Sequence, residues 1–162
     1  MSLKKIFQEN MPPLVLAFLA FGIDRITKIK ILNITKDENY IFINNYLNFD
    51  LVWNTGIGFG LFSFNADIAY HLISTLIFCV LILLIFLLLK ANKLQKWYFS
   101  IILGGAIGNF YDRIAYFAVP DFIDLHYDNF HWFTFNVADI FITIGILLIL
   151  VSEFKDDKNE NF

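Results

Sequence analysis

The sequence is poor in charge and nearly free of cysteine. Aspartate, glutamate, lysine and arginine make up 17% of the 162 residues, below the roughly 25% that is usual in soluble domains. One cysteine, Cys79, excludes an internal disulfide framework and a zinc site built on paired cysteines. A net charge of −3 provides no basic surface for nucleic acid. These absences exclude a nucleic-acid-binding protein and a disulfide-rich secreted domain.

The sequence is instead rich in apolar side chains, which make up 58% of it, with 19% aromatic residues and a mean hydropathy of +0.62. A helix needs about 20 apolar residues to cross a bilayer. The sequence therefore predicts one domain, residues 1–162, of an α-helical integral membrane protein. Four stretches have the required length: Pro12 to Leu32, Ala69 to Leu89, Trp97 to Arg113 and Phe133 to Ser152.

The lysines predict how these spans are oriented, because short cytoplasmic loops carry an excess of lysine and arginine. Lysines lie before the first span, between the second and third, and after the fourth: Lys4, Lys5, Lys90, Lys93, Lys96, Lys155 and Lys158. We therefore expect both termini to be cytoplasmic, with residues 153–162 a disordered tail. Lys28 and Lys30 oppose this orientation, but the three other segments agree with it. Pro12 and Pro13 suit a helix start.

The first outer segment has the alternating pattern of a β-strand. Apolar and polar side chains alternate from Leu47 to Asn54, and Tyr40 to Ile43 could pair with that strand. We expect a small extracytoplasmic sheet within residues 39–60. Four aromatic residues of this region are candidate anchors at the membrane interface: Trp53, Phe59, Phe62 and Phe64.

Polar and charged side chains inside the predicted spans mark candidate functional positions, since such groups are costly in lipid. They recur at helical spacing in three spans: Asp24, Thr27 and Lys28; Asn109, Asp112 and Arg113; Asn136, Asp139 and Thr143. Asp24 and Lys28 are spaced for an intrahelical ion pair, and Asp112 could pair with Arg113. Asp139 has no cation within one helical turn. It is therefore the strongest candidate for a functional role.

Three carboxylates could converge near the outer membrane boundary: Asp112, Asp121 and Asp139. Two carboxylates in a site of low dielectric tend to share one proton. An aspartic protease uses such a pair, in which one member activates water and the other protonates the scissile carbonyl. Spacing alone leaves open whether Asp112 or Asp121 is the partner of Asp139.

Other hydrolase chemistries lack their signatures. The sequence contains no His-Glu-x-x-His run and no Gly-x-Ser-x-Gly elbow. His71, His126 and His131 lack the spacing of metal ligands, so we expect neither a metal nor a cofactor. Two alternatives remain, a small ion or proton transporter and a noncatalytic membrane scaffold. Transport would require polar groups in the cytoplasmic half of the bundle, and a scaffold would tolerate Asp139→Asn.

Five segments carry a resemblance to the lipoprotein signal peptidases, the signal peptidase II family. They are Asp24 to Lys28, Asn54-Thr-Gly-Ile-Gly-Phe-Gly60, Gly104-Gly-Ala-Ile-Gly-Asn-Phe-Tyr-Asp-Arg113, Val119-Pro-Asp-Phe122 and Phe135-Asn-Val-Ala-Asp139. The segments follow the family's order and span nearly the whole chain. The segments Gly104 to Arg113 and Phe135 to Asp139, taken together, are specific for this family.

The resemblance implies an intramembrane aspartic endopeptidase of the bacterial inner membrane. It would remove the signal peptide from diacylglyceryl-modified prolipoproteins, just before the lipidated cysteine. It also implies that Asp121 and Asp139 are the catalytic dyad. Seven residues would support the dyad or contact substrate: Asn54, Gly56, Asn109, Arg113, Asn136, Asp24 and Lys28. The outer strands and the loop to Gly60 would form a cradle over the substrate. We further expect a monomer that contacts membrane lipid and binds the cyclic depsipeptide globomycin.

Overall fold

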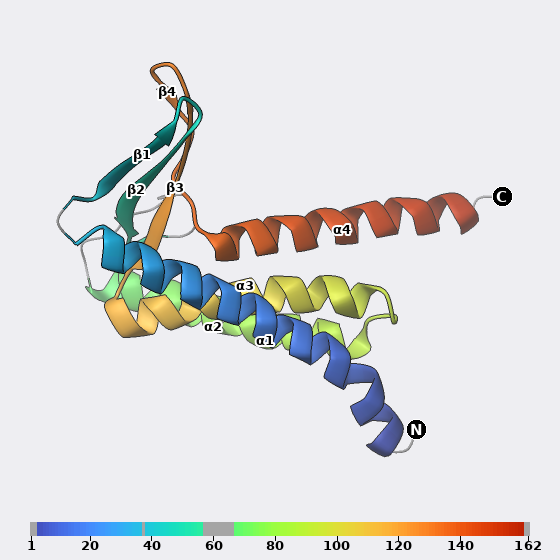
Figure 1. Ribbon diagram of the computed structural model, residues 1–162. Coiled ribbons are helices and arrows are strands. Elements are labelled where there is room, and N and C mark those ends of the chain that lie inside the picture. The colour runs from blue at the N-terminus through green and yellow to red at the C-terminus, as the bar shows by residue number, and fades with distance from the viewer. Residues whose placement is uncertain (1–2, 37, 57–66, 161–162) are drawn as a thin grey trace.

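A computed structural model describes residues 3–36, 38–56 and 67–160 of the chain (Figure 1). In chain order the elements are α1 (Leu3–Ile34), β1 (Tyr40–Asn44), β2 (Leu47–Asn54), α2 (Asp67–Lys90), α3 (Gln95–Tyr116), β3 (Val119–Tyr127), β4 (Phe130–His131) and α4 (Val137–Glu160). The expected anchors Phe59, Phe62 and Phe64 and the loop beyond Gly56 lie outside the described residues.

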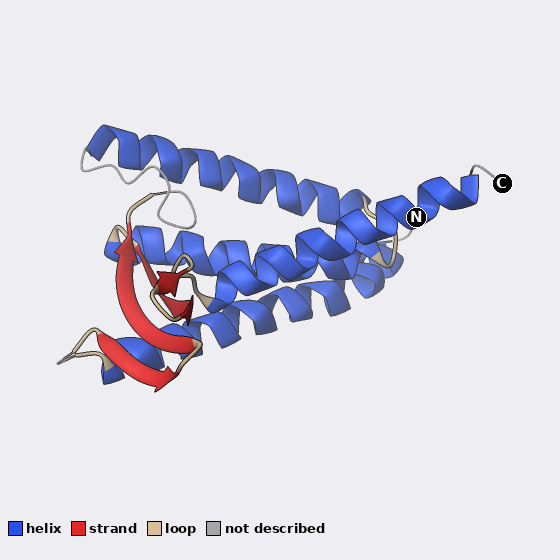
Figure 2. Cartoon of the chain, turned by 90° about the horizontal axis from the view of Figure 1, so that it is seen from above, coloured by secondary structure: helices blue, strands red, loops and turns tan. Residues whose placement is uncertain are grey.

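The helices run side by side and the sheet lies at one end of them (Figures 1 and 2). Both chain ends lie at the opposite end of the bundle (Figure 1). Glycines on α3 allow the close packing. A Cβ at Gly104 would lie 2.4 Å from the backbone oxygen of Ala17 on α1, and one at Gly105 would lie 2.5 Å from that of Ala138 on α4. Small residues at such positions let neighbouring helices approach closely in lipid.

Two helices differ from their expected limits. Pro12 and Pro13 lie inside α1, which begins at Leu3, so the expectation that they start the helix is wrong. Proline inside a helix removes a backbone hydrogen bond and favours a bend, and the N-terminal part of α1 bends away from the rest (Figure 1). α4 continues to Glu160, so the segment expected to be a disordered tail is helical over most of its length. It contains no glycine or proline that would end the helix.

The sheet has four antiparallel strands in the order β1-β2-β3-β4. The prediction of β1 and β2 is confirmed, whereas β3 and β4 were not predicted. β3 pairs with β2 through Asn48 opposite Asp124 and Val52 opposite Asp121, with an irregularity between Phe49 and Val52. The third strand therefore carries one of the candidate catalytic residues into the sheet.

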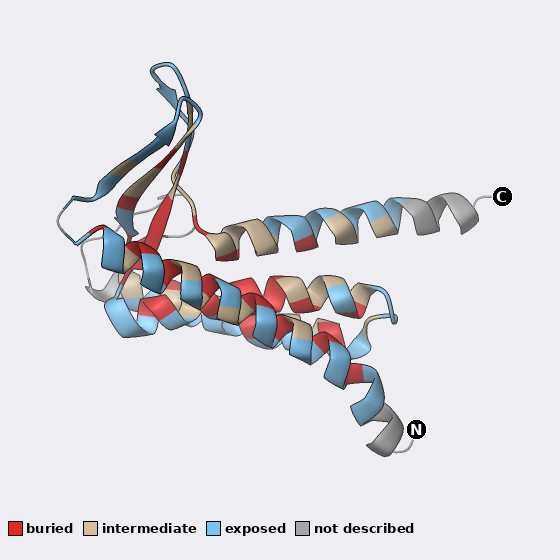
Figure 3. Cartoon of the chain, viewed as in Figure 1, coloured by how far each residue is buried: buried red, intermediate tan, exposed pale blue. Residues whose placement is uncertain are grey.

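Two of the helices are long and apolar enough to cross a membrane, among the residues that the structure describes: Tyr70–Lys90 and Val137–Phe154. Large apolar side chains are exposed on the bundle, among them Phe18 on α1, Leu72 on α2 and Leu147 on α4. Polar residues are buried instead, including Asp24, Lys28 and Asp112 (Figure 3). An apolar outside around a charged inside is the arrangement expected of a protein in lipid.

Candidate active site

The site is built around the first turn of α4, where Asn136 and Asp139 cap each other. The backbone NH of Asp139 donates to Asn136 Oδ1 at 3.2 Å, and the backbone NH of Asn136 donates to Asp139 Oδ2 at 3.0 Å. This exchange is a capping box, which satisfies two backbone groups at the helix start. A third, the NH of Ala138, donates to Asp24 Oδ1 at 2.9 Å. The capping fixes the direction of the Asp139 carboxylate.

Asp121 lies on β3 and is 2% exposed. Its two carboxylate oxygens accept from two amides, Oδ1 from Asn136 Nδ2 at 2.6 Å and Oδ2 from Asn54 Nδ2 at 2.9 Å. Asn54 reaches Asp121 because it lies on the same face of β2 as Val52, the residue opposite Asp121. Asn136 therefore contacts both Asp121 and Asp139.

Burial and, after it, the nearby negative charge of Asp139 raise the pKa of Asp121 to about 7. The amides of Asn54 and Asn136 act in the opposite direction because they donate to the carboxylate. An aspartic acid with this pKa can hold or release a proton near neutral pH.

The C-terminal half of α3 supplies the other side of the site. Asn109 donates to Asp139 Oδ1 at 2.8 Å and accepts from Lys28 Nζ at 2.8 Å. Arg113, buried at 4% exposure, donates to the backbone oxygen of Gly56 at 2.6 Å. The NH of Gly56 in turn donates to Asn54 Oδ1 at 2.9 Å. Arg113 thus holds the loop that follows β2 beside Asp121.

Lys28 lies at the centre of the buried charges. Its ammonium group forms ion pairs with Asp24 Oδ2 at 2.9 Å and with Asp112 Oδ2 at 2.7 Å. The predicted pair of Asp24 with Lys28 is confirmed. The predicted pair of Asp112 with Arg113 is wrong, because neighbouring residues on a helix point in different directions and Asp112 pairs with Arg25 and Lys28.

The structure therefore separates the two possible partners of Asp139. Asp112 is fully buried and pairs with cations of α1. Asp121 instead accepts from the side chain of Asn136, and the backbone NH of the same asparagine donates to Asp139. All seven supporting residues expected from the sequence lie in one connected network of contacts around the two carboxylates.

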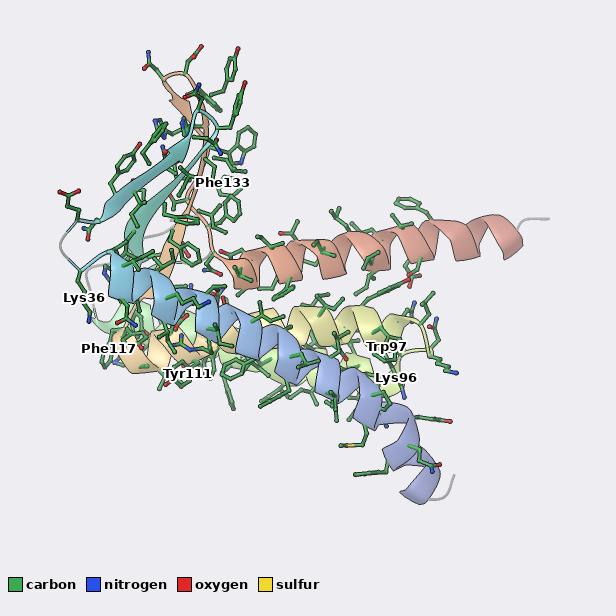
Figure 4. The ribbon with its side chains drawn as sticks, in the orientation of Figure 1. Lys36, Lys96, Trp97, Tyr111, Phe117 and Phe133 are labelled. Atoms are coloured by element: carbon green, nitrogen blue, oxygen red, sulfur yellow. The ribbon has the colours of Figure 1, made fainter. Side chains whose placement is uncertain are left out.

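An apolar cavity of about 640 Å³ opens beside Asp139, between α4 and the β3–β4 hairpin. Its lining includes Phe130, Trp132, Phe133, Ile140 and Thr143. Phe133 lies where the sheet meets α4, and Trp97 marks the other end of the bundle (Figure 4). Nothing in the local sequence predicts this cavity, because the placement of its aromatic residues depends on β3 and β4.

Comparison with known proteins identifies the family. The sequence pattern of signal peptidase II matches residues 16–155. A lipoprotein signal peptidase of Pelagibacter ubique (strain HTCC1062) is 52% identical over 151 residues, 91% of each chain. One from Blochmanniella pennsylvanica (strain BPEN) is 43% identical and covers 71% of this chain and 72% of its own.

A solved bacterial membrane enzyme has a similar fold, with a TM-score of 0.76 and 29% sequence identity, covering 91% of this chain and 90% of that one. A second solved bacterial membrane enzyme gives a TM-score of 0.75 at 28% identity, covering 90% and 94%. The pattern, the relatives and the fold agree with the site geometry, and the chain belongs to the signal peptidase II family of lipoprotein signal peptidases.

Proposed function

We propose that Asp121 and Asp139 are the catalytic dyad of this aspartic endopeptidase, and that its substrates are diacylglyceryl-modified prolipoproteins cleaved just before the lipidated cysteine. The observation that carries the proposal is the position of Asn136, whose side-chain amide donates to the Asp121 carboxylate and whose backbone NH donates to the Asp139 carboxylate. Membership of the family makes the chain a protease, and aspartic chemistry is the type known for that family.

We assign the two carboxylates different tasks. Asp121, with a pKa of about 7, is the member that carries the shared proton and donates it to the scissile carbonyl. Asp139 accepts from Asn109 and from the backbone of Asn136, both of which favour its ionised form. Ionised Asp139 draws a proton from the attacking water. The new bond joins the water oxygen to the carbonyl carbon, and the peptide C–N bond then breaks with a proton passing to the leaving nitrogen.

The cavity beside Asp139 supports a lipid-modified substrate. Its lining is apolar and aromatic, which suits an acyl chain or the apolar part of a signal peptide. A substrate anchored by lipid stays at membrane depth, so the dyad meets the peptide bond without extraction of the anchor. Arg113 and Asn54 fix the loop at Gly56 beside Asp121, where that loop would contact the substrate backbone. β1 and β2 would form a cradle above it.

We propose four membrane spans, corresponding to α1 to α4, in the bacterial inner membrane. α1 and α3 carry charged residues within their expected spans, but Asp24, Lys28 and Asp112 are enclosed within the bundle. The sheet end faces outward, because the lysines flanking the other end favour the cytoplasm. Both chain ends lie at that second end (Figure 1), as an even number of spans requires. We propose that the enzyme acts as a monomer and that globomycin competes for the site.

Cleavage of a purified, diacylglyceryl-modified prolipoprotein by the detergent-solubilised enzyme tests the dyad. The variants are Asp121→Asn and Asp139→Asn, which keep side-chain size and remove the carboxylate. Asp128→Asn is the matched control, because Asp128 is exposed in the turn between β3 and β4. Release of the signal peptide is followed by gel shift. We expect each dyad variant to lose about 10²- to 10⁴-fold in rate, and the control to keep it.

Thermal unfolding of every variant shows whether the fold is intact. A folded Asp121→Asn or Asp139→Asn enzyme that still cleaves at the wild-type rate removes that residue from the dyad. Inhibition of the wild-type enzyme by globomycin, measured in the same assay, tests the inhibitor site. The absence of cleavage by the wild-type enzyme on any lipidated substrate would contradict the proposed substrate class.

A further inference from the structure

A second group of chemically reactive side chains lies on the sheet, apart from the dyad. Asn48 on β2 is directly opposite Asp124 on β3, and His126 on β3 is directly opposite His131 on β4. Opposed residues of antiparallel strands share a face, and so do residues two apart on one strand. Three neighbouring strands therefore present these four side chains on the same face of the sheet.

The side chains converge closely. The Nδ1 atom of His131 lies 2.9 Å from Asp124 Oδ2 and 3.1 Å from Asp124 Oδ1, and the Nδ1 atom of His126 lies 3.8 Å from the same Oδ2. One ligand atom from each of the three residues lies within 4.8 Å of the others. Ligands of a tetrahedral zinc ion at about 2.1 Å are separated by about 3.4 Å. The two distances from Asp124 Oδ2 to the histidine nitrogens, 2.9 Å and 3.8 Å, each differ from that spacing by about 0.5 Å or less.

Asn48 provides an independent indication of a ligand. Asn48 is 1% exposed, and its Oδ1 atom has no hydrogen-bond partner among the residues that the structure describes. Its Nδ2 atom lies 3.2 Å from His126 Nδ1 and 3.4 Å from Asp124 Oδ2. A half-turn of the amide exchanges nitrogen and oxygen. That turn directs the unpartnered oxygen at the same point as the histidine nitrogens, where a cation would satisfy it.

We propose that Asp124, His126 and His131 bind a divalent transition-metal ion, with Zn²⁺ the best match, and that Asn48 contributes through its side-chain oxygen. This site goes beyond the proteolytic function and does not rest on it. No metal was expected from the sequence, because the spacing of the histidines along the chain does not match that of metal ligands. The β3–β4 hairpin brings His126 and His131 together across the turn.

The donor set determines which ions fit. Two imidazole nitrogens favour Zn²⁺ and related transition ions, whereas Mg²⁺ and Ca²⁺ prefer oxygen ligands. Asp124 is buried, with its side chain 4% exposed, and supplies a charge in the interior of the site. The His131 side chain is 53% exposed, so an ion can reach the site from solvent.

Metal binding would tie β2, β3 and β4 together. β4 contains only two residues, and a strand this short contributes few backbone hydrogen bonds of its own. A ligand on each of β3 and β4, with Asn48 on β2, would hold the hairpin against the sheet. Since metal bound only by the folded state stabilises that state, Zn²⁺ should raise the melting temperature of the protein.

Calorimetric titration of the full-length, tag-free protein in detergent with Zn²⁺ tests the site. The variants are His126→Gln and His131→Gln, and His71→Gln on α2 is the matched control, because His71 is exposed and lies far from the sheet in sequence. We expect one saturable equivalent and a higher melting temperature for the wild type and the control. Removal of a group that only supports a metal ligand costs roughly 10- to 100-fold in affinity. Removal of a ligand itself should cost more, so we expect each histidine variant to lose more than this.

A second measurement tests the site in the wild-type protein alone, so its result does not depend on whether the variants fold. Diethyl pyrocarbonate modifies accessible histidines, and mass spectrometry locates the products. Zn²⁺ should protect His131 from modification and leave His71 unchanged, and Mg²⁺ should protect neither. Absence of saturable binding, equal binding by the His126→Gln and His131→Gln variants, or modification of His131 unaffected by Zn²⁺ would overturn the site.

Discussion

Asn136 donates its amide to Asp121 at 2.6 Å while its own side-chain oxygen accepts from the backbone of Asp139 at 3.2 Å. One side chain therefore caps α4 and links the helix to β3. The position of Asp121 relative to Asp139 depends on this residue more than on any direct contact between the two carboxylates. Because the cap and the link share one side chain, helix stability and dyad geometry should change together when it is altered.

Asn136→Ala should lower both stability and activity. Loss of the cap costs about 1 kcal/mol, and loss of a hydrogen bond to a charged group costs about 1.5–3 kcal/mol, or roughly 10- to 150-fold in rate if the bond acts in the transition state. Asn44→Ala is the control, since Asn44 Oδ1 accepts from the backbone of Tyr46 and Leu47 in the turn between β1 and β2. Thermal unfolding and cleavage rates are measured for both. Equal loss of activity in the two variants would contradict a special role for Asn136.

The stability of the enzyme should fall as pH rises towards 7. The pKa of Asp121 is about 7 in the folded protein against an ordinary value of 3.8. Between these values the folded state binds more protons than the unfolded state, so the free energy of unfolding decreases with increasing pH and levels off above about 7. Melting temperatures in detergent from pH 5 to pH 8 measure the slope. Asp121→Asn should flatten it, and an unchanged slope in that variant would assign the effect to other groups.

Periodicity in the sequence predicted the elements whose side chains alternate or repeat regularly. The β1–β2 pair belongs to this class, since β2 alternates from Leu47 to Asn54, whereas the helices were predicted from the length of their apolar runs. β3 was missed because most of its residues from Val119 to Asp124 are buried regardless of face. A proline near the start of the strand, Pro120, also argues against a strand.

Contacts within one helix were easier to predict than contacts between elements. The pair of Asp24 with Lys28 follows from spacing by four residues, and the structure contains it. The pair of Arg25 with Asp112 spans 87 residues of sequence, and nothing in local spacing indicates it. The Asp124, His126 and His131 cluster was missed for the same reason, because it forms only when β4 folds back on β3.

Gly108→Ala should destabilise the bundle. A Cβ at Gly108 would lie 2.4 Å from Asp24 Oδ2, and the carboxylate cannot retreat without losing its bonds to Lys28 and to the backbone of Ala138. Overpacking of this kind costs about 1–3 kcal/mol. Gly22→Ala on α1 is the control, because nothing lies within 4 Å of its Cβ position. Thermal unfolding compares the two. A neutral Gly108→Ala would show that α1 and α3 can separate at this contact.

Lys28→Met should destabilise the protein more than any single neutralisation at the surface. Lys28 is fully buried, and its removal takes the ammonium group away from both Asp24 and Asp112 while Arg25 still pairs with Asp112. Removing one partner of a buried ion pair costs about 3–5 kcal/mol. Lys30→Met, two residues further on and exposed, should change little.

Addition of Asp24→Asn to Lys28→Met should restore part of the lost stability, because it removes the carboxylate that Lys28→Met deprives of its cation. Denaturant titration in mixed micelles gives the free energies of unfolding of Lys28→Met, Lys30→Met and the double variant. Equal effects of Lys28→Met and Lys30→Met, or no recovery in the double variant, would contradict the view that Lys28 neutralises the carboxylates between α1 and α3.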